Sequence, residues 1–488
     1  MSRSEKRNFR LYTQKYRDGE KKYWLLFTKM QRQSHYDEKA LKAAVADEFE
    51  DRSFAAAKNY LWNLLNDFLL IYAPENHKYD QCRRCLDRAH LLHQRGIVSA
   101  ARKELRTAHK IADEYEFIDL QLQLNRLERN ILKLYQRKKF QQALADLLST
   151  QTALKARREE REQQEVLYDR LGIYIRLNLS QLSAEHLREI EAVAQHPALQ
   201  PDYRPAGFTA RRLYLQSRCF LLGFHEQREQ EFTAYRQLLA HWEAHPHQQE
   251  ELYPEFRLFL CNFLHCAANN SRYDAFAPVL DRLESLPVES EEDEIEAFSV
   301  GLFYRHLLAL NERRLDDALA LMATVPEKLD RYGTKLVDST RLGFQANLLL
   351  THFWAGDFRQ ANHWAEQLQR HPLTQQRVDL QGLARIFSVV TAYELVDDGD
   401  YEHLISRAKA GAEWLRKKGL ARSFARSVLN GMVRLMQRGD PKARHNVIRQ
   451  LHDELEQMSA QKLRPGMEEV LYWTKSKLLG RQIADLIR

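Results

Sequence analysis

Glycine and proline are scarce in this sequence, which has 17 glycines and 12 prolines among 488 residues. A protein built from many β-strands needs frequent turns, and glycine and proline supply a large share of the residues in such turns. The abundant residues are instead leucine, alanine, glutamate, glutamine, lysine and arginine, all of which favour helices. The composition therefore predicts an all-α fold and excludes a β-rich one.

Long apolar runs are also missing. The N-terminal stretch MSRSEKRNFRLYTQKYRDGEKKYW is polar and basic, unlike a signal peptide or a membrane anchor. Apolar stretches such as residues 68–73 are too short to span a bilayer. These absences predict a protein without membrane insertion, and we expect it in the cytoplasm.

Patterns for disulfides and metals are weak. The five cysteines are too few and too scattered for a disulfide framework. Cys82 and Cys85 form a CxxC, but no second pair lies at zinc-site spacing, so two cysteines on one helix face are the favoured interpretation. His241, His245 and His247 are the strongest metal candidate, yet a solvated helix end explains them better. We expect no bound metal and no cofactor.

Catalytic motifs are missing as well. The sequence contains no GxxxxGK[ST], HExxH, GxSxG or GxGxxG pattern. These are the common signatures of phosphate binding, zinc proteolysis, serine hydrolysis and dinucleotide binding. We therefore predict a protein that is not an enzyme and has no catalytic residues.

Positive charge is concentrated near the N-terminus. The formal net charge is +7, and residues 1–33 carry ten Lys or Arg against three Asp or Glu, so the rest of the chain is balanced. We call residues 1–33 the basic arm. Its candidate contact residues are Arg7, Arg10, Lys15, Arg17, Lys21 and Lys22. Aromatic residues lie between these cations. This mixture fits nucleic-acid binding, docking on an acidic protein, or the buried side of an amphipathic cap helix. The cap helix is the favoured interpretation.

Two other charged runs have structural explanations. The acidic run at residues 289–296 follows Pro287 and precedes an apolar segment, so it predicts the N-terminus of a helix. Pairing of this run with a basic partner is the alternative. The mixed run at residues 155–165 predicts an exposed helix with ion pairs between its side chains.

One stretch, residues 344–372, predicts a hairpin of two antiparallel helices. Its sequence is FQANLLLTHFWAGDFRQANHWAEQLQRHP. Gly356 and Asp357 mark the turn, Phe358 fills the corner, and Ala361 is small enough to let the two helices approach closely. Pro372 then ends the second helix.

Similar hairpins recur along the chain. The corner residues align at Val98, Phe140, Leu182, Phe224, Tyr273, Leu315, Phe358 and Tyr401, at steps of 42, 42, 42, 49, 42, 43 and 43 residues. We attribute the longer step to an insertion near residues 244–254, and we expect a further turn at residues 438–441. An alanine lies three positions after four of these corners, at Ala101, Ala143, Ala318 and Ala361. After about four residues for each connection, this period leaves helices of about 17 residues.

The Gly-Asp-Phe turn, the alanine after it and the closing proline resemble the tetratricopeptide repeat, although Gln345 and Leu349 depart from its pattern. The unit is longer than the usual 34 residues of that repeat, and long-helix relatives occur in bacterial regulators and signalling adaptors. The resemblance implies a right-handed α-solenoid of about nine to ten antiparallel helix pairs. HEAT-like stacking is the structural alternative. We expect a basic arm and helical cap at residues 1–76, followed by the solenoid at residues 77–488.

In the tetratricopeptide family, ligands usually bind in the groove lined by the first helices. The matching positions here are Ala346, Leu350, Phe353, Val389, Tyr393 and Val396. These residues suit an amphipathic helix or an apolar peptide, but they fit the core between repeats equally well. The leading functional hypothesis is a scaffold that binds a protein or peptide. The alternatives are a peptide-responsive regulator and a nucleic-acid-associated protein that uses the basic arm.

Overall fold

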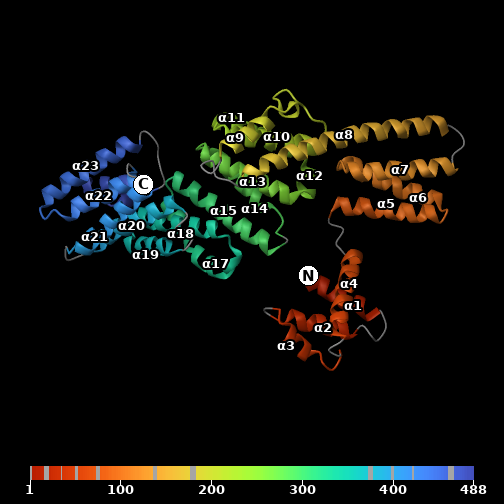
Figure 1. Cartoon of the computed structure of the whole chain (residues 1–488), viewed down its shortest axis with the longest axis horizontal. Coiled ribbons are helices and arrows are strands. Elements are labelled where there is room, and N and C mark those ends of the chain that lie inside the picture. Colours follow the sequence, from red (N-terminus) through yellow and green to blue (C-terminus); the bar gives the residue numbers. More distant parts are fainter. Residues whose placement is uncertain are drawn as a thin grey trace. The chain divides into compact units, whose positions relative to one another are not determined.

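The computed structural model describes most of the chain. The described residues are 3–15, 21–33, 36–49, 53–72, 77–135, 140–175, 183–288, 290–371, 377–396, 400–419, 423–459 and 466–487. Every regular element among them is helical, and helices that follow one another in the chain mostly pack as neighbours (Figure 1). The all-α prediction is confirmed.

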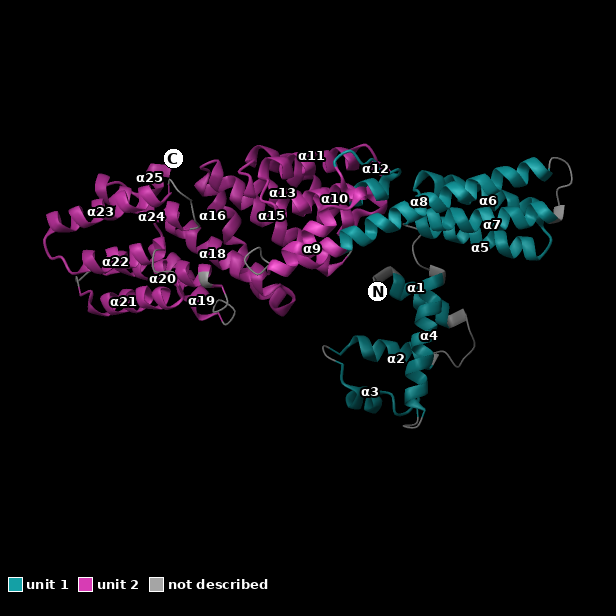
Figure 2. Ribbon diagram, turned by 45° about the horizontal axis from the view of Figure 1, so that its top comes forward, with its two compact units in different colours: residues 1–169, 201–213 teal, residues 170–200, 214–488 magenta. Residues whose placement is uncertain are grey.

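The helices form two compact units (Figure 2). Unit 1 comprises Met1–Asp169 and Pro201–Leu213, and unit 2 comprises Arg170–Gln200 and Tyr214–Arg488. The boundary that the sequence suggested near residue 76 falls between two hydrophobic clusters of unit 1, one ending at Phe68 and the next beginning at Cys82.

The first cluster belongs to four helices that include the basic arm. These are α1 (Arg3–Lys15), α2 (Lys21–Gln31), α3 (Glu38–Ala44) and α4 (Phe54–Tyr72). The ring of Phe9 lies at the centre of the cluster, with its centroid 5.1 Å from those of Phe27 and Phe68. Tyr12 is also buried, and Trp24 packs against the cluster. These burials favour the cap-helix interpretation of the aromatic residues.

The second cluster belongs to α5 (Lys78–Gln94), α6 (Val98–Glu114) and α7 (Ile118–Tyr135). Unit 1 also contains most of α8 (Phe140–Ile175). The α8 helix has 36 residues, twice the predicted length. Its middle is the charged run at 155–165, which contains only good helix formers and no turn residue. Ion pairs of Arg161 with Asp119 (2.9 Å) and Glu165 (3.3 Å) confirm the ion-paired helix predicted there, although the run is only partly exposed and Gln164 is buried.

Most residues of the later helices belong to unit 2. They are α9 (Ala184–Ala194), η3 (Pro197–Leu199), α10 (Phe208–Phe224), α11 (Arg228–Glu243), α12 (Pro246–Glu251), α13 (Tyr253–Asn269), η4 (Tyr273–Ala275), α14 (Phe276–Ser285), α15 (Glu291–Asn311), α16 (Leu315–Ala323), α17 (Val325–Tyr332), η5 (Gly333–Lys335), α18 (Asp338–Trp354), α19 (Phe358–Arg370), α20 (Val378–Leu395), α21 (Glu402–Lys417), α22 (Phe424–Met436), α23 (Pro441–Ser459), α24 (Met467–Leu479) and α25 (Ile483–Ile487). A large hydrophobic cluster extends from Leu315 to Ile487 and includes residues of both α18 and α24.

Seven of the described turns between neighbouring helices share one backbone geometry. Each has a residue with positive φ: Gly96 (74°), Glu116 (55°), Glu226 (54°), Ser271 (54°), Arg313 (61°), Gly356 (76°) and Gly480 (64°). The following residue donates its N–H to the carbonyl five positions earlier, as Asp357 does to His352 across 2.9 Å. This bond closes a Schellman turn, which satisfies a carbonyl at the end of the first helix.

The predicted corner residues mostly begin the second helix of a pair. Val98, Phe140, Leu315 and Phe358 are first residues of helices, Tyr273 begins η4, Tyr401 precedes α21, and Leu182 lies outside the described residues. Phe224 is wrong, because it ends α10 and the next helix begins at Arg228. The turn there has Glu226 rather than glycine at its positive-φ position, so no glycine in the sequence indicated where the turn lies. With Arg228 as the corner, the step to Tyr273 is 45 residues instead of 49.

The alanines behind the corners differ in burial. Ala101, Ala318 and Ala361 are completely buried, as their predicted role between two close helices requires. Ala143 is only half-buried. Three positions after the corrected corner stands Glu231, and a Cβ on the nearby Gly223 would lie 3.0 Å from its Oε1. Glycine on the opposing helix therefore makes room for a carboxylate where the other pairs have alanine.

Candidate functional site

Helix α24 is tied to two much earlier helices by reciprocal hydrogen bonds. The indole N–H of Trp354, at the end of α18, donates to Oε1 of Glu469 across 3.1 Å. In the other direction, the indole N–H of Trp473 donates to Oε1 of Glu394 in α20 across 2.8 Å. Lys477 of α24 binds the second oxygen of Glu394 at 2.5 Å. Each side of this junction therefore contributes one tryptophan and one glutamate.

Apolar side chains complete the same junction. The ring centroid of Trp354 lies 5.0 Å from that of Tyr472, and that of Tyr393 lies 6.4 Å from that of Trp473. The first residues of α24 also approach α20 closely. We call the receiving surface the α24 seat, and it consists of Trp354, Leu383, Phe387, Tyr393 and Glu394.

Gly466 permits the close approach of α24 to the seat. It immediately precedes α24 and has a φ of +84°, which side-chain-bearing residues adopt at a cost. A Cβ at this position would clash with Leu383 and lie 3.1 Å from the ring of Phe387. Backbone conformation and packing therefore both require glycine here.

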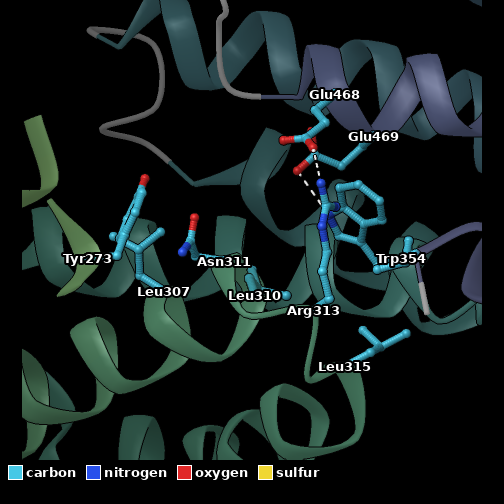
Figure 3. A pocket seen from close by; sticks show the side chains of 10 residues that line it. Tyr273, Leu307, Leu310, Asn311, Arg313, Leu315, Trp354, Glu468 and Glu469 are labelled. Carbon is cyan, nitrogen blue, oxygen red and sulfur yellow. Dashed lines mark hydrogen bonds and ion pairs between the residues drawn. The ribbon is translucent and has the colours of Figure 1, made fainter. Parts of the chain in front are cut away.

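A cavity of about 200 Å³ lies beside the junction (Figure 3). Its lining residues are Tyr273, Leu307, Leu310, Asn311, Arg313, Leu315, Trp354, Glu468, Glu469 and Ile487. Arg313, whose backbone adopts the positive-φ turn before α16, reaches Glu468 at 3.3 Å and places its guanidinium 5.5 Å from the centroid of the Tyr472 ring. A second pair of residues thus connects α24 to an earlier part of unit 2.

Glu469 is the most perturbed carboxyl at this junction. Its side chain is buried, and this burial raises its pKa from the ordinary value of 4.5 to about 7. Hydrogen bonds from the backbone and from Trp354 act against the rise, because they favour the charged form, while the neighbouring charge of Glu468 adds to it. The carboxyl therefore gains and loses its proton close to neutral pH.

The groove residues predicted from the sequence lie at or beneath this surface. Ala346, Phe353 and Val389 are buried in the large cluster, and Leu350, Tyr393 and Val396 are half-buried against it. The ring of Phe353 packs between α19 and α20, with its centroid 5.5 Å from Phe358 and 4.7 Å from Phe387. This burial favours the core interpretation over an open groove.

Of the six predicted groove residues, Tyr393 belongs to the α24 seat. Trp354 and Glu394, which make the polar contacts, follow Phe353 and Tyr393 by one position and were missed. The available signal was the spacing of Glu469 and Trp473, which places a carboxylate and an indole on one helix face.

The basic arm is described only in part. Arg7 and Arg10 are exposed on α1. The ammonium group of Lys22 lies 5.4 Å from the ring of Tyr23 and 5.3 Å from that of Phe49, so it already has aromatic partners. Arg17 and the side chains of Lys15 and Lys21 lie outside the described part of the structure.

The cysteine candidates are part of a helix, and the histidine candidates lie in and between α11 and α12. Cys82 and Cys85 are buried in α5, where Cys82 Sγ donates to the carbonyl of Ala108 across 3.3 Å. Burial raises the pKa of Cys82 to about 12, which makes its thiol a poor nucleophile and metal ligand. His245 Nδ1 lies 2.8 Å from the carbonyl oxygen of His241 in α11. Among the described residues, no three His, Cys, Asp or Glu side chains are grouped as a metal site requires.

The acidic run begins α15, as predicted. Ser290 caps the helix and forms a capping box with Asp293. Asp293 also pairs with the buried Arg257, and Lys335 pairs with Glu291 at 2.5 Å. Basic partners for these acids are therefore supplied by the chain itself.

None of the described helices is long and apolar enough to cross a membrane. Comparison of the chain with protein-family models, with curated proteins and with solved structures finds no match.

Proposed function

We propose that the protein is a non-enzymatic scaffold that binds a partner through an amphipathic helix, and that the α24 seat is the binding surface. The observation that carries this proposal is that the seat already holds a helix of its own chain through two indole–carboxylate hydrogen bonds. Buried polar pairs of this kind select a partner, because a helix lacking either group leaves the other unpaired.

The chemistry of the seat specifies the partner helix. Trp354 presents an N–H donor, and Glu394 presents a carboxylate beside the ring of Tyr393. A matching helix carries a carboxylate and, four residues later, a tryptophan, in the order of Glu469 and Trp473. A small residue just before the helix lies against Leu383 and Phe387, as Gly466 does, and an aromatic residue at the position of Tyr472 packs on Trp354.

For the architecture, we propose the finer arrangement that the sequence suggested, a right-handed, tetratricopeptide-like solenoid. The shared geometry of seven turns and the buried alanines behind three corners support it. Stacked hairpins leave an extended surface on which a helix can lie.

A peptide that repeats the sequence of α24 tests the proposed function. A fluorescein-labelled peptide of residues 466–480 is titrated with the full-length protein, and its anisotropy is measured. In the wild type, the internal α24 competes at high effective concentration, so binding is weak. In the Trp473→Ala variant the internal competitor has lost an anchor, and we expect binding at least tenfold tighter.

Two controls make this test specific. A peptide with alanine at the positions of Glu469 and Trp473 is expected not to bind, and the Glu394→Gln change in the Trp473→Ala background is expected to weaken binding. Circular dichroism verifies folding, and Trp473→Phe replaces Trp473→Ala if the latter is unfolded. Equal binding of both peptides, or no binding to any folded variant, contradicts the proposal.

A second candidate function, a peptide-responsive regulator, is favoured by the position of α24 in the seat. A partner that occupies the seat releases α24, and with it α25, from the large cluster. Small-angle scattering with and without the α24 peptide tests this function. If the protein is such a regulator, the peptide changes the radius of gyration of the wild type but not that of the Glu394→Gln variant. An unchanged radius of gyration of the wild type at saturating peptide contradicts this second function.

A further inference from the structure

A larger cavity lies within unit 1, between α6, α7 and α8. Its volume is about 660 Å³, which is within the usual range for sites that hold small organic molecules. Side chains of Leu105, Ile131, Leu132 and Leu147 contribute an apolar lining. Two of these leucines and Ile131 are almost inaccessible from outside, so the apolar part forms the floor of the cavity.

The start of α8 lines the cavity and is packed less closely than the starts of the comparable helices. Ala143 lies three positions after a corner residue, like Ala101, Ala318 and Ala361. Those three alanines are completely buried, whereas Ala143 is half-buried and lines the cavity. Near this position, Asn125 of α7 donates to the carbonyl of Leu147 across 2.9 Å. This hairpin therefore remains open at a place where the comparable hairpins are filled.

Two arginines at the cavity have no acidic partner. Arg102 and Arg106 lie one turn apart on α6, and neither guanidinium makes an ion pair or a hydrogen bond within the described part of the chain. The two acidic residues of the lining have partners other than these arginines, and one of those partners, His109, also lines the cavity. Glu128 contacts His109 at 3.1 Å, and Asp146 accepts a hydrogen bond from Gln142 at 2.8 Å. The cavity thus combines an apolar floor with two available guanidinium groups.

We propose that this cavity binds one anionic amphiphile, an apolar molecule of medium length that bears a single carboxylate. The apolar body lies on the leucine and isoleucine floor, and the carboxylate binds Arg102 and Arg106. Guanidinium groups pair with carboxylates through two parallel hydrogen bonds, which gives both orientation and charge selection. This site is independent of the α24 seat, which lies in the other unit.

Calorimetric titration of the full-length protein with decanoate, below its micellar concentration, tests the proposal. We expect one decanoate bound per chain. The double variant Arg102→Gln/Arg106→Gln is expected to bind at least tenfold more weakly. The matched control is Lys103→Gln/Lys110→Gln, which removes two exposed cations of the same helix that do not line the cavity, and it is expected to bind like the wild type.

Two further measurements separate the cavity from general adsorption. Ala143→Trp fills the cavity and is expected to abolish decanoate binding while leaving binding of the α24 peptide unchanged. Decyltrimethylammonium, which has the same chain length and the opposite charge, is expected not to bind. The proposal is overturned if decanoate does not bind, if the cation binds equally well, or if the Arg102→Gln/Arg106→Gln variant binds decanoate like the wild type.

Discussion

The indole N–H of Trp354 donates a hydrogen bond to the carboxyl of Glu469 across 3.1 Å, although the two residues are 115 positions apart in the chain. Both side chains are buried. Trp473 and Glu394 repeat the pairing with the roles of the two segments exchanged. Helix α24 is therefore held on α18 and α20 by specific polar contacts in addition to apolar packing.

The first prediction concerns the proton of Glu469. Because its pKa in the folded protein is raised to about 7, the stabilisation from this group is fully present below pH 4.5 and is lost as the pH rises through 7. A rise of this size corresponds to about 3 kcal/mol. We expect the protection of the α24 amides against hydrogen exchange, corrected for intrinsic rates, to fall between pH 6 and 8.

Glu469→Gln is the control for this pH dependence. Glutamine has nearly the same shape and does not titrate, so α24 in the variant is expected to be protected equally at pH 6 and pH 8. A wild-type protein whose α24 protection is the same at both values would show that the carboxyl does not titrate in this range.

The second prediction has the opposite sign and concerns His306 of α15. This side chain is buried, its Nε2 lies 2.6 Å from Thr351 Oγ1, and burial lowers its pKa from 6.5 to about 4. Protonation therefore favours the unfolded state, and stability is lost as the pH falls from 6.5 to 4, by up to about 3 kcal/mol. Thermal unfolding in the Glu469→Gln background, which removes the opposing contribution, measures this loss.

His306→Gln keeps an N–H donor for Thr351 without a titrating ring. The Thr351 hydroxyl donates to the carbonyl of Asn347 at 2.7 Å, so the histidine must donate through Nε2. The melting temperature of this variant is expected to change little between pH 6.5 and 4.5. If the melting temperature of this variant falls as steeply as that of the parent protein, a group other than His306 causes the acid sensitivity.

The third prediction concerns the turns. Glu226 is exposed and has a φ of 54°, a conformation that glycine adopts without the steric cost of a Cβ. Glu226→Gly is expected to stabilise the protein by about 1 kcal/mol. The reverse change, Gly356→Ala, is expected to destabilise it by a similar amount. No atom lies within 4 Å of the added Cβ at Gly356, so the backbone conformation alone is responsible.

Chemical denaturation of the two turn variants measures these differences. Glu226→Ala serves as the control, because it removes the same side chain but keeps the Cβ. If Glu226→Ala stabilises the protein as much as Glu226→Gly does, the effect comes from the lost charge and not from the backbone.

The fourth prediction concerns helix packing. Ala361 is completely buried between α18 and α19, so Ala361→Glu places a charge without a partner between two close helices. We expect the free energy of unfolding, measured by thermal unfolding, to fall by about 3 kcal/mol or more. The matched control is Gln367→Glu, which introduces the same side chain at an exposed position of α19. Its melting temperature is expected to equal that of the wild type.

The helices and most turns were predictable from local sequence. Glycine at Gly356 marked its turn, because glycine acts on the backbone where it stands, while Pro372, predicted to end the second helix of that hairpin, lies outside the described residues. The turn at Glu226 was misplaced by four residues, because its positive φ is adopted by a residue with no special preference for it. The length of α8 was missed, since the regular spacing of corners suggested a break that the charged run does not contain.

The junction at α24 was not predictable in the same way. The six residues proposed for a groove followed a family pattern, and the structure buries three of them in the core. Trp354 and Glu394 meet partners more than seventy positions away. Local periodicity carries no information about such pairs. Only the close approach at Gly466 and the position of α24 in space bring them together.

Amide hydrogen exchange in α24 tests the central claim most directly. The measurement compares the wild type with the Trp354→Phe/Glu394→Gln variant, which removes one donor and one charged acceptor from the seat. We predict that residues 467–479 exchange at least tenfold faster in the variant, while α5 and α6 exchange as in the wild type. Equal exchange of α24 in the two proteins would contradict the claim that the indole–carboxylate pairs hold this helix in place.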